Sequence, residues 1–98
     1  MSNQFGSKIR QLREQHNLLL RQVAPLLEID SPQLSKIERG ERQAKKELIP
    51  LFAEILKVPQ EELFTLWLAD QVFEMVQDEP TSVESLKLTL KRLKHDDK

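Results

Sequence analysis

The chain has 98 residues, 39% of them apolar and 32% charged, with a formal net charge of -1. This length and composition predict one compact, helix-rich domain, because a second independent core would need a longer chain. Cysteine is absent from the sequence, and His16 and His95 lie far apart without clustered carboxylates. We therefore expect neither a disulfide framework nor a metal site.

The sequence also lacks the apolar run needed to span a bilayer, and its first residues, MSNQFGSK, are unlike a signal peptide. We expect a cytoplasmic protein that does not bind membranes. Charge is unevenly distributed: residues 1–58 hold ten Lys or Arg and seven Asp or Glu, net +3, whereas residues 59–98 hold five and nine, net -4. Because phosphate affinity depends on local cations and counterion release, the basic part can still bind nucleic acid.

The first expected helix covers residues 5–16, with Phe5, Ile9 and Leu12 facing inward. His16 would end this helix, where its charged form interacts favourably with the helix dipole.

Residues 18–40 predict two short helices joined by a tight acidic turn. In the first, Val23, Ala24 and Leu27 form a narrow apolar stripe that allows a close helix crossing at Ala24. Pro25 lies past the first turn, so we expect it to kink or shorten this helix.

The second short helix begins with a predicted capping box, Asp30 with Gln33, and has Pro32 in its first turn. Gly40 provides the left-handed residue that ends it. Leu34 and Ile37 face inward, so the opposite side is polar and basic. This is the layout of a helix-turn-helix DNA reader. The expected base-reading residues are Ser31, Pro32, Gln33, Ser35, Lys36 and Arg39.

The segment RGERQAKK, residues 39–46, is a predicted loop rich in basic side chains. We expect these cations to bind backbone phosphates beside the groove; the alternative is an ordinary solvated charged surface. The expected phosphate-binding residues are Arg21, Arg42, Lys45 and Lys46.

Two helices follow, over residues 46–56 and from Pro59 to Val76. The first has a broad apolar face expected to be buried: Leu48, Ile49, Leu51, Phe52, Ile55 and Leu56. The second is more apolar than a small monomer needs, since a second stripe would remain in water. We expect this stripe to form a dimer interface; the alternative is that the final segment covers it. Its members are Phe64, Leu68, Val72 and Met75.

The last expected helix begins at the capping box formed by Thr81 and Glu84. It carries a heptad seam too short to hold a coiled coil alone, so it either adds to the dimer interface or folds back on the preceding helix. The seam residues are Val83, Leu86, Leu90 and Leu93.

Taken together, Ile37-Glu38-Arg39-Gly40, Ala24 and the Ile9-Arg10-x-Leu12-Arg13 pattern resemble the Xre/Cro/lambda-repressor family of helix-turn-helix regulators. The resemblance covers about the first two thirds of the chain. It departs at Leu19 and Leu20, where relatives have a capping Ser or Thr followed by Gln.

The resemblance implies an all-α fold: a five-helix lambda-repressor-like DNA-binding domain over residues 1–69, with a C-terminal helical extension for dimerisation over residues 70–98. It also implies an ion pair between Arg13 and Glu38, the alternative being that Glu38 reaches solvent.

The expected function is a homodimeric transcriptional regulator that binds double-stranded DNA at an inverted-repeat operator. Among small members of the family, the chain is similar to regulators of restriction-modification and methyltransferase loci. The alternative is an antitoxin or other interaction module whose C-terminal region binds a partner protein. Cofactors and small-molecule ligands are not indicated, and the sequence shows no nucleophile with an adjacent base, so we do not expect an enzyme.

Overall fold

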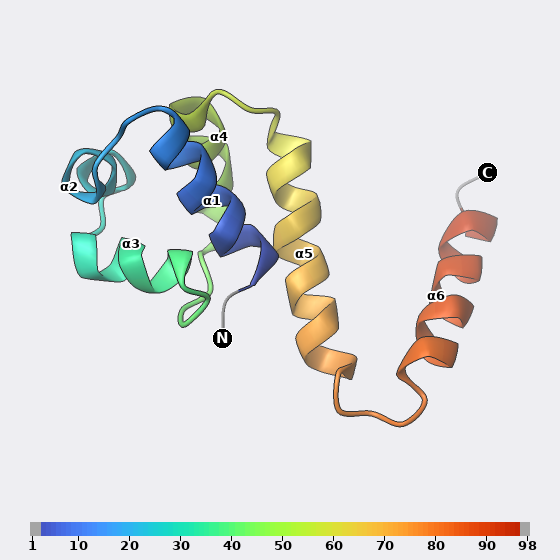
Figure 1. The fold of residues 1–98 in the computed structure, drawn as a ribbon. Helices are drawn as coiled ribbons and strands as arrows, with labels where there is room; N and C mark the ends of the chain where they lie inside the picture. The colour runs from blue at the N-terminus through green and yellow to red at the C-terminus, as the bar shows by residue number, and fades with distance from the viewer. Residues whose placement is uncertain (1–2, 97–98) are drawn as a thin grey trace.

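The computed structural model describes residues 3–96, and all of its regular structure is helical, as predicted (Figure 1). The outer bounds of the two predicted segments, residues 1 and 98, lie outside the described residues. Two short 3₁₀-helices, η1 and η2, interrupt six α-helices. The elements are α1 (Gln4–Gln15), α2 (Leu20–Val23), η1 (Ala24–Leu27), α3 (Ser31–Glu38), η2 (Lys46–Leu48), α4 (Ile49–Leu56), α5 (Gln60–Val76) and α6 (Ser82–Asp96).

The hydrophobic core lies among α1 to α4 and the first turn of α5. The ring of Phe5 on α1 packs edge-to-face on that of Phe52 on α4, with centroids 5.7 Å apart. Leu63 is the last fully buried residue of the described chain, so the rest of α5 leaves the core. The buried apolar residues are Phe5, Ile9, Leu12, Val23, Ala24, Leu27, Leu34, Ile37, Ala44, Ile49, Phe52, Ala53, Leu56 and Leu63.

Pro25 limits the helix before the turn, as predicted. The α-helix ends at Val23, and the chain continues as the 3₁₀-helix η1 with Pro25 in its first turn. Leu19 at the N-cap of α2 has no side-chain acceptor to offer. Instead, the side-chain oxygen of Gln22 accepts from the Leu19 amide at 2.7 Å.

The helix predicted over residues 46–56 is divided in the structure, which corrects that prediction. Residues Lys46–Leu48 form η2, and the α-helix begins only at Ile49. Pro50 explains the division, because a proline is tolerated in the first turn of an α-helix but not in its interior. Leu51, predicted to be buried, is 36% exposed.

Helix α5 is continuous through the predicted domain boundary at residues 69 and 70. Asp70 also caps α1: its carboxylate oxygens accept from the backbone amides of Gln4 at 3.1 Å and Phe5 at 2.8 Å. Asn3 accepts from the Gly6 amide at 2.7 Å in the same turn. Because Asp70 contributes to the cap of α1, the part of α5 that packs with the first four helices extends at least to Asp70.

Helix α6 stands apart from α5, to which it is joined by a turn (Figure 1). Its residues 83–95 are all exposed. The alternative in which the last segment folds back over α5 is therefore not what the structure shows. None of the helices described is both long enough and apolar enough to cross a membrane.

Candidate DNA-binding surface

The recognition helix α3 is fixed at both ends. Asp30 caps it by accepting from the Gln33 amide at 2.7 Å, which is one half of the predicted capping box; the described hydrogen bonds do not include the return bond to the Gln33 side chain. At the other end Gly40 has φ of 76°, in the left-handed region that favours glycine. Leu34 and Ile37 are buried, and this anchors one face of α3 in the core.

Helix α1 approaches α3 so closely that only glycine fits at the contact. A Cβ atom on Gly6 would lie 2.4 Å from the carbonyl oxygen of Ile37 and 2.6 Å from that of Glu38. Both obstacles are backbone atoms, which cannot rotate out of the way. Gly6 therefore sets the distance between the scaffold helix and the recognition helix.

A buried ion pair joins the same two helices. Arg13 donates to Glu38 twice, from Nε at 2.7 Å and from Nη2 at 3.0 Å, and its Nη1 donates to the Leu18 carbonyl at 2.8 Å. Hydrogen bonding to Glu38 raises the pKa of Arg13, so the guanidinium stays charged. The structure thus forms the pair that the family resemblance implied, and Glu38 does not reach solvent.

The outer face of α3 is open, and the predicted base-reading residues lie along it. Pro32, Lys36 and Arg39 are exposed, while Ser31, Gln33 and Ser35 are half-buried. Arg39 also makes an ion pair with Glu41, at 3.1 Å between Nε and Oε2. Lys36 is therefore the cation of this face that has no carboxylate competing for it among the described ion pairs.

The four predicted phosphate-binding side chains are all exposed. Arg21 lies on α2, Arg42 and Lys45 lie in the loop after α3, and Lys46 begins η2. The Lys46 ammonium sits 5.9 Å from the centroid of the Phe64 ring, within range of a cation–π interaction. Lys46 is thus the one of the four that is tied to α5.

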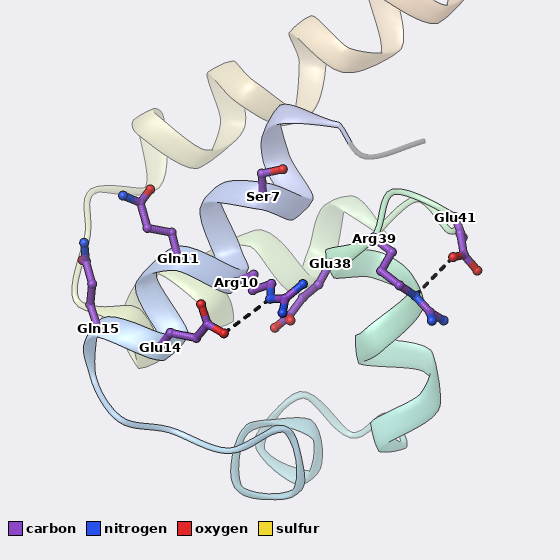
Figure 2. Close-up of a pocket in the computed structure, with 8 residues that line it drawn as sticks. All are labelled: Ser7, Arg10, Gln11, Glu14, Gln15, Glu38, Arg39 and Glu41. Carbon is purple, nitrogen blue, oxygen red and sulfur yellow. Dashed lines mark hydrogen bonds and ion pairs between the residues drawn. The ribbon is translucent and has the colours of Figure 1, made fainter.

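A shallow hollow lies beside the contact between α1 and the C-terminal end of α3 (Figure 2). Two ion pairs flank it, Arg10 with Glu14 at 3.4 Å and Arg39 with Glu41 at 3.1 Å. Glu38 also lines the hollow, but its carboxylate is paired with Arg13. Because Arg10 and Arg39, the two arginines of the lining, are each paired with a carboxylate, the hollow offers no unpaired arginine to an anion.

The predicted dimer stripe on α5 is partly open. Leu68 and Met75 are 57% and 78% exposed, and Val72 is half-buried. Phe64 departs from the prediction, because it packs against the core and edge-to-face on Trp67. Phe73 is also 56% exposed, but nine residues along the helix place it on the side of α5 opposite Phe64, away from Leu68 and Met75. The α6 seam residues Val83, Leu86, Leu90 and Leu93 are all exposed.

Two side chains make long-range hydrogen bonds that the sequence does not predict. Asp70 caps α1. Trp67 packs against the core, and its Nε1–H donates to the Ala44 carbonyl in the loop after α3, at 2.8 Å. The only available signal was chemical: a buried carboxylate or indole N–H needs a partner, but the sequence does not say which.

A family model described as "Helix-turn-helix domain" matches residues 4–66, which include α1 through α4, the recognition helix and the start of α5. The chain belongs to this helix-turn-helix family. The resemblance to Xre-type regulators drawn from its motifs is therefore confirmed.

Individual relatives agree with this assignment. The chain is 42% identical over 60 residues to an uncharacterized HTH-type transcriptional regulator, RghRB of Bacillus subtilis (strain 168); the match covers 60% of this chain and 43% of RghRB, less than half of that protein. Among solved structures it is similar to the restriction-modification controller protein C.AhdI from Aeromonas hydrophila, with a TM-score of 0.56 and 32% identity, over 61% of this chain and 91% of that one.

The clp gene regulator ClgR from Corynebacterium glutamicum shares the fold, with a TM-score of 0.58 and 19% identity, over 85% of this chain and 88% of ClgR.

Proposed function

We propose that this helix-turn-helix protein is a transcriptional regulator that binds a specific DNA sequence through α3. The observation that carries the proposal is the open polar face of α3 with Lys36 near its centre, on a helix whose opposite face is anchored in the core. A rigid helix with a free basic face can enter the major groove. The Arg13–Glu38 pair and the close contact at Gly6 fix its orientation.

Sequence selectivity and overall affinity come from different side chains in this proposal. Lys36 reads a base edge, with Ser35 and Gln33 beside it, whereas Arg21, Arg42, Lys45 and Lys46 bind phosphates. Phosphate contacts position the domain and carry no sequence information.

The regulator acts as a homodimer on an inverted repeat, in our proposal. Support comes from the open apolar stripe of α5, which includes Leu68 and Met75, and from the exposed seam of α6. Charge favours contact between α6 of one copy and α5 of the other. Helix α5 carries Glu61, Glu62, Asp70 and Glu74 and no cation, whereas α6 carries four cations, Lys87, Lys91, Arg92 and Lys94, and two carboxylates, Glu84 and Asp96. Two copies would place their recognition helices about one DNA turn (~34 Å) apart.

The likeness to a restriction-modification controller supports a regulated locus of that kind. The exposed seam of α6 also suits a second candidate function, capture of a partner protein as an antitoxin would do. A pull-down from the native host separates the two, because an antitoxin brings down one stoichiometric partner and a plain regulator does not.

The test is a hydroxyl-radical footprint on the DNA upstream of the chain's own coding sequence, with random DNA of equal length as competitor. We expect two protected half-sites related by a twofold axis, centred one helical turn apart. Uniform weak protection that random DNA abolishes equally would contradict sequence-specific binding.

A further inference from the structure

The loop between α3 and η2 must be held in place for Arg42 and Lys45 to meet phosphates. Near α3, the Glu41 and Arg42 amides donate to the Lys36 carbonyl at 2.9 and 3.3 Å; near η2, the Leu48 amide donates to the Lys45 carbonyl at 2.9 Å. Between these points the loop is anchored at Ala44, whose side chain is 3% exposed.

The same residue is held by helix α5. The Ala44 carbonyl accepts from Nε1 of Trp67 at 2.8 Å, and the two residues are 23 positions apart. The Trp67 ring packs edge-to-face on Phe64, with centroids 6.4 Å apart, and the Lys46 ammonium lies over the Phe64 ring. Two neighbouring aromatic side chains of α5 therefore contact the basic loop, one near each end of the run from Ala44 to Lys46.

Packing alone would not require a tryptophan at this position. A phenylalanine could keep an aromatic contact with Phe64, but only the indole N–H can donate to the Ala44 carbonyl. Without that donor the half-buried carbonyl loses its partner, and the loop becomes free to rearrange.

We propose that Trp67 is a positioning residue for the phosphate-binding loop: its N–H fixes Ala44 and thereby places Arg42 and Lys45 beside the DNA backbone. This inference rests on the proposed function. Helix α5 would then connect the phosphate-binding loop to the dimer interface, because Leu68, the residue after Trp67, lies on the open surface proposed for dimerisation.

The experiment compares Trp67→Phe with Thr65→Val in the full chain. Thr65 is exposed on the same helix, and its hydroxyl donates to the Glu61 carbonyl within α5, so Thr65→Val removes one hydrogen bond without touching the loop. DNA affinity is measured by fluorescence anisotropy, at several salt concentrations, on the footprinted sequence.

For Trp67→Phe we expect DNA affinity to fall about threefold to tenfold, the effect of one lost hydrogen bond. The slope of log affinity against log salt should become shallower by up to about two units, one for each misplaced cation. The preferred sequence should stay unchanged, because α3 is untouched. Thr65→Val should match the unmodified protein in all three measurements.

Hydrogen exchange of the Glu41, Arg42 and Leu48 amides, which donate to the Lys36 and Lys45 carbonyls at the two ends of the loop, gives an independent readout without DNA. Faster exchange is expected in Trp67→Phe and not in Thr65→Val. If Trp67→Phe loses its helical circular dichroism, 3-benzothienylalanine at position 67 replaces it, because this side chain keeps the shape of indole and lacks the N–H.

The outcomes separate the two proposals. If the unmodified protein binds DNA but the loss of the N–H changes neither the salt slope nor loop exchange, the role of Trp67 is overturned. An affinity loss with an unchanged slope and altered base preference would overturn it as well, because the defect would then lie in α3. If the unmodified protein binds no DNA sequence, the proposed function fails, and with it any role in phosphate binding, whatever loop exchange shows.

Discussion

Arg13 on α1 and Glu38 on α3 form a bidentate ion pair where the two helices meet. The third nitrogen of the guanidinium, Nη1, donates to the Leu18 carbonyl just before α2. The Arg13 and Glu38 side chains are only 11% and 4% exposed. One side chain thus ties three segments together around the recognition helix. Replacing both members of a buried ion pair with apolar side chains changes the stability of a protein little. Removing only one member is strongly destabilising, because it leaves the other charge buried without a partner.

We therefore expect Arg13→Met to lower the free energy of unfolding by about 3–5 kcal/mol. The double variant Arg13→Met with Glu38→Leu should lose less than the single variant, because no isolated charge remains. Urea unfolding followed by circular dichroism measures both. A single variant as stable as the unmodified protein would mean that Glu38 is solvated in solution.

Gly6→Ala sets helix propensity against packing. Alanine stabilises a helix interior by about 1 kcal/mol over glycine, so propensity alone predicts a gain. The new Cβ would meet two backbone carbonyls of α3 at 2.4 and 2.6 Å, however, and overpacking of this kind costs about 1–3 kcal/mol. We expect a net loss of stability by thermal unfolding. Ser7→Ala, exposed on the same helix, is the control and should change stability little; a more stable Gly6→Ala would show that α1 and α3 can separate freely.

Much of this fold was predictable because its signals are local. The spacing of Phe5, Ile9 and Leu12 fixes the buried face of α1, and Asp30 with Gly40 marks the ends of α3. Pro25 predicts the short helix before the turn for the same reason, since its effect is confined to its own backbone.

The features that were missed depend on contacts between distant segments. Asp70 caps α1 across 65 positions, and Trp67 reaches Ala44 across 23. Nothing in the periodicity of α5 distinguishes a side chain that faces the core from one that faces a partner. Phe64 was therefore assigned to the open stripe, although Trp67 and Lys46 cover it.

Lys36→Ala tests base reading directly. Lys36 is exposed on the outer face of α3 and is not part of any of the described ion pairs. We expect binding to the footprinted site to weaken by roughly 1–3 kcal/mol and selectivity to relax at one base pair. Competition against single-base variants of the site measures this. Equal weakening on random DNA would make Lys36 a phosphate contact instead.

Glu41→Gln should strengthen DNA binding. Glu41 pairs with Arg39 at 3.1 Å, and both side chains are about half exposed, so the pair contributes little to stability. Glu41→Gln would therefore free Arg39 for DNA without unfolding the protein. Removing the carboxylate also removes a negative charge near the phosphates. We expect affinity to rise about twofold to fivefold, the size of an exposed ion pair. Glu54→Gln, an exposed substitution on α4 with the same change in net charge, should have a smaller effect. An equal gain from both variants would attribute the change to net charge alone.

The dimer is tested on the open surface of α5. Leu68 is 57% exposed, and a twofold interface repeats every substitution, so Leu68→Glu would bring two carboxylates into one apolar contact. We expect this variant to remain helical yet sediment as a monomer at micromolar concentration, where the unmodified protein sediments as a dimer. Operator affinity should fall steeply, because the second half-site would no longer bind at raised effective concentration. Gln77→Glu adds the same charge just beyond the end of α5 and should remain dimeric. If the unmodified protein is a monomer both alone and on operator DNA, the dimer proposal is wrong.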